Sequence, residues 1–233
     1  MAERPDLTGE LWGFGDGWPA FMLEDTVAGL MGPLAGRYPQ LQLLLLDGDR
    51  CIGKAHAVPV AWDGAEASLP DRGWDEMLIR GAREAAPTAV SALEITVRPD
   101  VRGKGLSAVL LEALRGAVRR FGVADLLAPV RPSLKSSEPF TPIAEYAARV
   151  REDGLPWDPW LRVHVRAGGH IVRVCPLSMM IAGTLAQWRA WTGLPFDADG
   201  DLAVPGALVP VAVSQARGQA VYVEPNVWVR HRV

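Results

Sequence analysis

The sequence predicts an α/β fold of the α+β kind, in which helices flank a mixed, mostly antiparallel central sheet. Three segments lead to this prediction: an apolar hairpin, a strand followed by a glycine turn and a long helix, and a buried strand directly after that helix. Two strands joined by a tight turn are antiparallel, whereas a strand, a crossover helix and a second strand form a parallel pair. Both kinds of pairing are therefore expected in one sheet.

The hairpin comprises residues 41–47 and 51–62, which are rich in apolar residues and are separated by Asp47-Gly-Asp-Arg50. An Asp-Gly pair suits a tight turn because glycine adopts positive φ at little cost. The helices expected on either side of the hairpin are a stretch at 19–37, interrupted by Gly32-Pro33, and one from Leu69 to about Ala85.

The centre of the chain changes its hydrophobic period within a few residues. Residues 93–98 alternate and are β-branched, which predicts a strand, and Pro99-Asp100 ends it. Residues 106–121 then place apolar side chains at the i, i+3, i+4 and i+7 positions of one helix face. The unit is a strand, a glycine turn and a helix.

The turn at residues 102–107 has the properties of an anion site. Backbone N–H groups at a helix start have no partner within the helix, and the helix dipole adds partial positive charge there. Gly103 and Gly105 let the backbone approach a ligand, and Arg102 and Lys104 add charge. The alternative is a strand-to-helix connection that binds nothing, because short glycine motifs are frequent by chance.

Val97-x-Pro99-x-x-Arg102-Gly103-x-Gly105-Leu106-Ser107 resembles motif A of the GCN5-related N-acetyltransferases (GNAT), although Ser107 departs from the usual final Gly or Ala. The resemblance implies that the turn holds the pyrophosphate of an acyl-coenzyme A such as acetyl-CoA, the donor substrate, with no metal. The donor-binding residues that it implies are Ile95, Thr96, Val97, Arg102, Gly103, Lys104, Gly105, Leu106 and Ser107.

The buried strand at 124–132 follows the long helix. The resemblance implies that this strand splays away from the central one where pantetheine enters, and Pro129 fits such a break because it cannot donate to a ladder. The elements expected after it are a short helix from Thr141-Pro142, a helix from Asp158-Pro159 to Gly168-Gly169, strands at 170–175 and 178–183, a helix at 185–192, and strands at 208–214 and 220–229. Asp197-Ala-Asp-Gly-Asp201 is expected to be a surface turn because it lacks the Gly and Glu positions of a calcium-binding loop.

Two side chains are candidates for acid–base chemistry. Glu94 resembles the strand glutamate that some GNAT members use as general base, and its alternative is an exposed strand residue. His164 precedes Gly168 by the spacing at which many members carry the tyrosine that protonates the leaving thiolate. A neutral imidazole can give or take a proton near pH 7, but a buried core histidine is also possible here. His170 and His231 are weaker candidates, and His56 on the hairpin is weaker still.

A second resemblance concerns the GNAT-like loading and decarboxylase domains of polyketide synthases. It rests on residues 129–135, 158–164 and 224–228, and it implies that His164 acts with Ser133 on malonyl-CoA and the thiol of a carrier protein. Three hypotheses follow: acyl transfer to an amine or thiol, with acetyl as the expected group; decarboxylation with S-transfer; and acyl-CoA binding without catalysis.

Composition limits the partners. Of the 233 residues, 49% are hydrophobic and 22% charged, and the net charge of −3 comes without a basic stripe for nucleic acid. Two cysteines are too few for a disulfide framework or zinc cluster, and no apolar run is long enough for a membrane span. We expect a cytoplasmic protein with a small-molecule or carrier-protein acceptor, and exposed strand edges near the C-terminus would allow a homodimer. Residues 1–233 are expected to form a single domain with an inserted helix at 63–90, an inserted loop and helix at 132–157, and a C-terminal extension at 176–233.

Overall fold

The computed structural model describes residues 3–13, 17–83 and 86–233. Its strands are β1 Gln42–Asp47, β2 Arg50–Val60, β3 Ala89–Val97, β4 Asp125–Val130, β5 His170–Thr184, β6 Gly200–Leu202, β7 Val211–Ser214 and β8 Gln219–Arg232. Its α-helices are α1 Met31–Arg37, α2 Trp74–Ala82, α3 Leu106–Phe121, α4 Ile143–Ala147, α5 Pro159–Arg166 and α6 Leu185–Thr192. Its 3₁₀ helices are η1 Pro5–Leu11, η2 Ala20–Glu24, η3 Thr26–Leu30, η4 Pro39–Leu41, η5 Glu66–Ser68, η6 Pro99–Val101 and η7 Lys135–Ser137.

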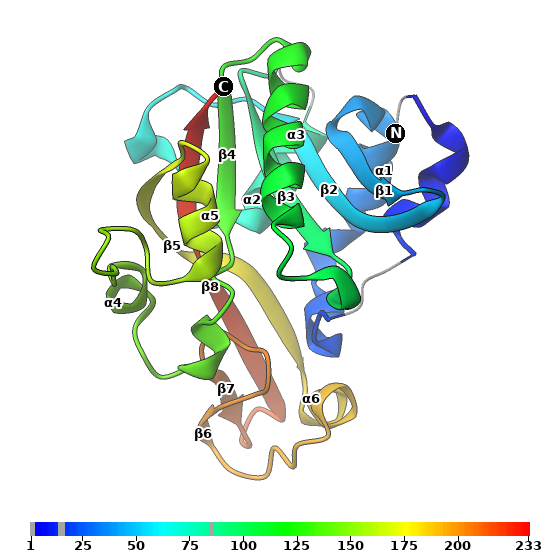
Figure 1. Cartoon of the computed structure of the whole chain (residues 1–233). Coiled ribbons are helices and arrows are strands. Elements are labelled where there is room, and N and C mark those ends of the chain that lie inside the picture. Colours follow the sequence, from blue (N-terminus) through cyan, green and yellow to red (C-terminus); the bar gives the residue numbers. More distant parts are fainter. Residues whose placement is uncertain (1–2, 14–16, 84–85) are drawn as a thin grey trace.

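The strands form one continuous sheet in the order β1-β2-β3-β4-β8-β7-β6, with β5 on the other edge of β8 (Figure 1). All of these pairs are antiparallel except β3 with β4. This arrangement confirms the predicted fold class, because the crossover through α3 makes the parallel pair and the tight connections make the antiparallel ones.

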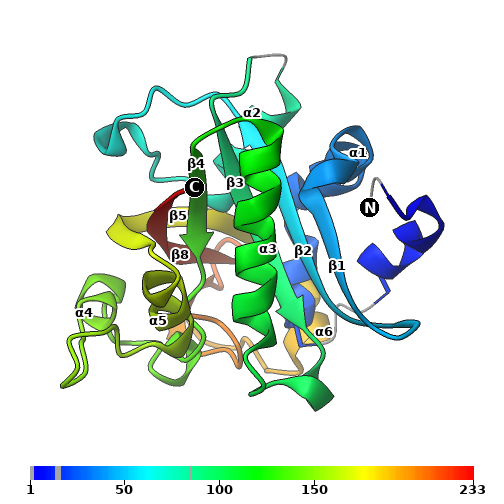
Figure 2. The same ribbon diagram turned by 45° about the horizontal axis from the view of Figure 1, so that its top comes forward.

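Helices cover both faces of the sheet. In Figures 1 and 2, α3 lies in front of β2 and β3, and α5 lies beside it over β5 and β8, while α1 and α2 lie on the opposite face. In the front core, the buried face of α3 packs against β3, β4 and β8 through side chains that include Leu111, Leu114 and Val118. The rear core joins the N-terminal segment, α2 and α6 around buried Trp188 and Trp228.

The parallel pair opens after two residues. β3 and β4 are paired only at Val90 with Leu126 and at Ser91 with Leu127. Beyond these positions β3 stays with β2 as far as Val97, whereas β4 follows β8, so that Pro129 pairs with Trp228. The predicted splay is therefore present, and it opens toward the end of the sheet where the glycine turn lies (Figure 1).

Several boundaries differ from the prediction. The helical stretch at 19–37 breaks at Asp25, which caps η3, rather than at Gly32-Pro33. Gly32-Pro33 lies in the first turn of α1, where a missing proline N–H does no harm. The next helix begins at Trp74 rather than Leu69, because Leu69 adopts extended backbone geometry after η5.

The C-terminal part also departs from expectation. The two strands predicted at 170–175 and 178–183 are one long strand, β5, whose register with β8 shifts between Cys175 and Met179. Pro176 in that interval has no N–H to donate, which fits the irregularity. The turn predicted at 197–201 was wrong in part, since Gly200–Leu202 forms β6 and pairs with β7.

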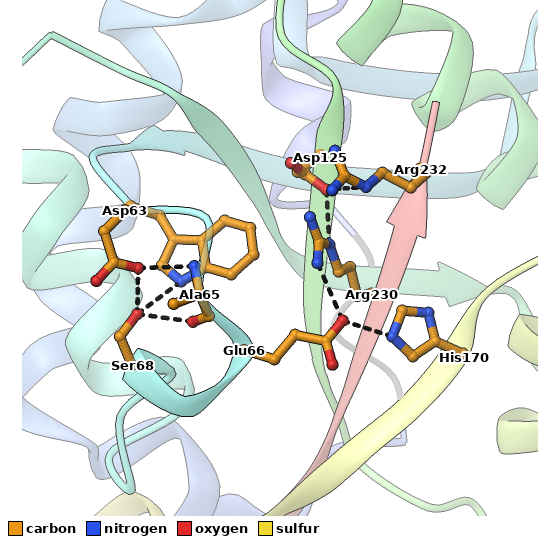
Figure 3. A network of polar contacts seen from close by, with 9 residues as sticks. Asp63, Ala65, Glu66, Ser68, Asp125, His170, Arg230 and Arg232 are labelled. Atoms are coloured by element: carbon orange, nitrogen blue, oxygen red, sulfur yellow. Dashed lines mark hydrogen bonds and ion pairs between the residues drawn. The ribbon is translucent and has the colours of Figure 1, made fainter.

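An ionic network fixes the connection between β2 and α2 at the end of the sheet opposite the glycine turn (Figure 3). Arg230 on β8 contacts Asp125 on β4 at 2.8 Å and Glu66 at 3.0 Å, and His170 contacts the same Glu66 oxygen at 2.7 Å. The Trp62 ring lies 4.8 Å from the Arg230 guanidinium. The network therefore joins the inserted segment to three strands.

No helix within the described ranges is long and apolar enough to cross a membrane.

Candidate active site

The glycine turn presents free backbone N–H groups at the start of α3. Gly103 and Gly105 have φ of 80° and 77°, values that L side chains rarely adopt. Gly105 is the N-cap, and no side chain caps the helix start. Residues 102–105 are exposed. The N–H of Ala108 bonds back to the Gly105 carbonyl at 3.0 Å, whereas those of Leu106 and Ser107 have no backbone partner among the described residues and are available to an anion.

Arg102 is turned back toward the sheet rather than out over the helix start. Its Nε donates to the Val97 carbonyl at 3.2 Å. Its Nη2 lies close to Gly17, since a Cβ atom added to that glycine would be only 3.1 Å away. The N-terminal segment thus passes beside the predicted donor-binding turn.

The β4-facing edge of β3 is open beyond Ser91 in the part of the chain that the structure describes. Residues 95–97, predicted to bind the donor, lie on this edge and pair with β2 on the other side. Backbone groups along such an edge can hydrogen-bond an extended ligand in the manner of an added strand.

Glu94 is a nearly buried carboxylate, with 11% of its side chain exposed. Its Oε1 accepts hydrogen bonds from Thr96 Oγ1 at 2.6 Å and from Trp18 Nε1 at 3.3 Å. Lys54 Nζ lies 3.5 Å from Oε2. The interpretation of Glu94 as an exposed strand residue was therefore wrong: the side chain lies in a polar cluster on the sheet face opposite α3.

Trp18 spans the mouth of the splay. Its indole N–H reaches Glu94 on β3, and its ring lies 5.6 Å from the guanidinium of Arg131, which follows β4. Arg131 is held in turn by Glu224, whose Oε2 is 3.0 Å from Nε, and by the Gly206 carbonyl. Trp18 thus connects the two strands that diverge.

Glu224 belongs to a row of polar side chains along β8. Tyr222 donates to Glu224 Oε2 at 2.9 Å, and Asn226 Nδ2 donates to Oε1 at 3.1 Å. Burial and the neighbouring carboxylate raise the pKa of the Tyr222 hydroxyl, so it stays a donor at neutral pH. The segment 224–228, to which the sequence assigned no mechanism of its own, supports Arg131 at the mouth of the splay.

His56 lies beside Glu94 on β2 and is almost completely buried. Its Nε2 is 3.8 Å from Glu94 Oε2, and its Nδ1 is 3.0 Å from Gln42 Oε1. The Trp12 ring stacks on the imidazole at 5.1 Å. Burial lowers the pKa of His56, against the opposing effect of Glu94. The ring is therefore neutral near pH 7.

His164 occupies a different place, between α5 and the end of β8. It is 2% exposed, and its Nδ1 lies 2.9 Å from Nε2 of His231. Burial and the second ring lower the pKa of His164 to about 3, and burial and Arg115 lower that of His231 to about 4. These contacts support a role in packing α5 against β8, and the catalytic role predicted for His164 stays a prediction.

Ser133 is exposed in the loop after β4, and its Oγ lies 3.4 Å from both carboxylate oxygens of Asp158. Asp158 also caps α5 and accepts from Tyr146 at 2.9 Å. Ser133 and His164 therefore have different partners, and the described contacts do not join them. The role predicted for Ser133 stays a prediction as well.

The structure brings together residues that the sequence did not group. Lys54 and Arg131 were not candidates, and His56 ranked last among the histidines. One signal was available: Lys54 and His56 are two apart on one strand, as are Glu94 and Thr96 on the next, so each pair shares a strand face. No group of three His, Cys, Asp or Glu side chains that could hold a metal ion occurs among the described residues.

Comparisons with known proteins agree with this geometry, although no model of a known protein family matches the chain. The loading GNATL domain of CurA from Lyngbya majuscula superposes with a TM-score of 0.56 at 19% identity, covering 84% of this chain and 78% of that domain. The GNAT-like decarboxylase GphF in complex with isobutyryl-CoA gives 0.52 at 18% identity, covering 85% of this chain and 81% of that one. The chain has the GNAT fold.

The sequence is also similar to that of the arginine N-acetyltransferase avaD from Aspergillus versicolor. The two are 36% identical over 190 residues, which is 71% of this chain. The chain spans 65% of the length of that relative. A GNAT fold with the predicted glycine turn is thus combined with sequence similarity to an amine acetyltransferase.

Proposed function

We propose that the protein is an acyl-CoA-dependent N-acetyltransferase that transfers an acetyl group from acetyl-CoA to the amine of a small molecule of the arginine type. The observation that carries the proposal is the position of Glu94. It lies on the strand that leads into the glycine turn, at the open splay, where a base would face a bound thioester. The similarity to an arginine N-acetyltransferase supports an amine acceptor.

The donor would lie in the splay. The N–H groups of Gly103 to Ser107 and the side chain of Lys104 would hold the pyrophosphate, as the motif implies. The open edge at Ile95, Thr96 and Val97 would bind pantetheine. A backbone N–H on this edge would also stabilise the oxyanion that forms when the thioester is attacked.

The acceptor would enter on the face opposite α3, where Trp18, Lys54 and Glu94 meet. Glu94 would take a proton from the acceptor ammonium and expose the lone pair that attacks the thioester carbonyl. Trp18 would place the Glu94 carboxylate through its indole N–H. An acetyl amide and free coenzyme A would be the products.

The carrier-protein hypothesis has less support. It required His164 and Ser133 to act together, whereas the contacts place His164 against His231 and Ser133 against Asp158. The likeness to GNAT-like loading and decarboxylase domains, at 19% and 18% identity, concerns the fold.

The test combines binding and turnover. Calorimetric titration with acetyl-CoA should give binding that Gly105→Glu weakens at least about tenfold, because an L residue at positive φ costs roughly 1–2 kcal/mol and the carboxylate repels the pyrophosphate. Release of coenzyme A is then followed with arginine and other small amines, and with a carrier-protein thiol as the competing acceptor.

Gly154→Glu is the matched control. Gly154 has a φ of 74° in an exposed loop with open space around it, so it carries the same backbone strain without the predicted ligand. Equal loss of acetyl-CoA binding in both variants, or turnover with the thiol alone, would overturn the proposal.

A further inference from the structure

The tautomer of the neutral His56 ring follows from its partner Gln42. The Gln42 amide nitrogen donates to the carbonyls of Tyr38 at 3.0 Å and Ala57 at 2.9 Å. This orientation turns Oε1, which can only accept, toward His56 Nδ1 at 3.0 Å. Nδ1 must therefore carry the proton of the neutral ring, and Nε2 presents a lone pair.

The Nε2 atom is an empty proton site. It is a buried polar atom without a hydrogen-bond partner among the described residues. Glu94 Oε2 lies 3.8 Å from it, and Glu94 and the Leu11 carbonyl both favour the protonated ring. A buried polar group without a partner is costly, so this arrangement calls for an explanation.

The groups around His56 act in both directions on a protonated ring. The Glu94 carboxylate attracts an imidazolium, and the stacked Trp12 ring stabilises a cation over its face. Lys54 Nζ, which donates to the Leu11 carbonyl at 2.9 Å, opposes the charge. Glu94 therefore favours a proton on His56, whereas burial and Lys54 oppose it.

We propose that His56 Nε2 receives the proton that Glu94 takes from the acceptor ammonium, so that Glu94 and His56 form a proton relay at the acceptor side of the sheet. The inference rests on the proposed acetyltransferase function. His56 acts through Glu94 and touches no substrate, which makes it a positioning residue. The gap of 3.8 Å closes with a small rotation of the Glu94 side chain, and such bonds are often long before substrate binds.

The relay accounts for both protons that an ammonium acceptor loses. The first passes from the acceptor nitrogen to Glu94 and on to His56 Nε2, which restores the carboxylate. The free amine attacks the thioester carbonyl and forms the N–C bond. The second proton passes from the tetrahedral adduct to Glu94 and then to the thiolate, as the C–S bond breaks. After the products leave, His56 returns the first proton to Glu94, which passes it to solvent water.

The experiment compares two acceptors in wild type and His56→Gln. Arginine brings a protonated α-amine at pH 7, whereas the nitrogen of methoxyamine is already unprotonated. His56→Gln should lower kcat with arginine by about 10–100-fold, the usual effect of losing a group that handles protons. With methoxyamine, which needs no proton removed before attack, the loss should be at most about threefold, and the affinity for acetyl-CoA should not change.

Two further variants secure the interpretation. His56→Asn keeps a donor for Gln42 and lacks Nε2, so it should repeat the result if His56→Gln folds poorly. His170→Gln is the control, because that half-exposed histidine pairs with Glu66 at the other end of the sheet and should match wild type.

The outcomes separate the two proposals. Equal losses with arginine and methoxyamine would show that His56 is merely structural and would overturn the relay while leaving the acetyltransferase function in place. Failure of wild type to release coenzyme A with either amine would remove the proposed function and the relay together.

Discussion

Two buried histidines lie on opposite faces of the same sheet in opposite surroundings. His56 faces a carboxylate, a lysine and an exposed aromatic ring beside the open splay. His164 faces a second neutral histidine and the ring of Trp160 at 4.4 Å, sealed between α5 and β8. Burial keeps both rings neutral, but only His56 lies beside a group that can deliver a proton to it. The neighbours of a buried histidine, more than its burial, therefore decide whether it can take part in proton transfer.

The largest effect is expected from removing the Glu94 carboxylate, which distinguishes the surroundings of His56 from those of His164. Glu94→Gln keeps an acceptor oxygen for Trp18 and Thr96 but cannot take a proton. We expect kcat to fall by about 10²–10⁴-fold in coenzyme A release assays, with acetyl-CoA affinity retained by calorimetry. Glu112→Gln on the exposed side of α3 is the control. A Glu94→Gln enzyme with normal kcat would place the base elsewhere.

The second test concerns the sealed pair. His164→Gln should lower the free energy of unfolding by about 1–3 kcal/mol, since it leaves His231 without its partner, as measured by urea denaturation. The kcat of the folded enzyme then discriminates between packing and catalysis. A loss as large as that of Glu94→Gln, without a loss of stability, would restore the catalytic role predicted from sequence.

The His164–His231 pair also predicts the direction in which stability changes with pH. The pKa values of His164 and His231 are lowered to about 3 and about 4 from an ordinary 6.5. Their contribution to stability is therefore complete above pH 6.5 and is lost as the pH falls toward these values, because the unfolded chain binds the protons first. Urea denaturation of wild type between pH 7 and pH 5 should show this decline, and His164→Gln should reduce it.

Trp18 tests whether the carboxylate beside His56 must be held in place. Trp18→Ala removes the donor to Glu94 and the ring against Arg131. We expect kcat/KM for the acceptor to fall by about tenfold, the usual cost of losing one hydrogen bond to a charged group, with unchanged acetyl-CoA affinity. Trp157→Ala, at a half-exposed tryptophan before α5, should have no effect. Equal changes in both variants would contradict a specific role.

The smallest expected effect concerns the packing of η3 against α2. Asp75 on α2 and Asp25, between η2 and η3, are both buried, and burial and the charge of Asp25 raise the pKa of Asp75 to about 7. A raised carboxyl pKa gives stability that is present below about pH 4 and is lost as the pH rises through 7, the reverse of the histidine pair. Asp75→Asn should remove this decline, worth about 1 kcal/mol, in thermal melts at pH 5 to 8. An unchanged profile would show that the two carboxyls do not share a proton.

Local signals were sufficient for much of the fold. The helices at 106–121 and 185–192 have the predicted bounds, because amphipathic period, glycine C-caps and a threonine N-cap act over a few residues. The strand, glycine turn and helix unit was equally clear, since its two glycines need positive φ.

The candidate site was harder to predict, and Glu94 alone among its polar cluster was named from the sequence as catalytic. His164 was favoured by its spacing from Gly168, but spacing cannot reveal that His231, 67 positions later, lies opposite. Trp18 gave no local signal of its role. The spacing of Lys54 and His56 indicates a shared strand face, but only the pairing of β2 with β3 places Glu94 beside them.

The sequence by itself determined the order of the elements, the glycine turn and the fold class, since each depends on interactions among near neighbours in the chain. Only the tertiary structure decided where β3 and β4 part, which histidine meets the carboxylate, and that Trp18 joins the two diverging strands. These features depend on the pairing of β4 with β8 and on the path of the N-terminal segment over β2 and β3. Contacts between residues 76 positions apart are set by packing of the whole sheet, which no short window of sequence contains.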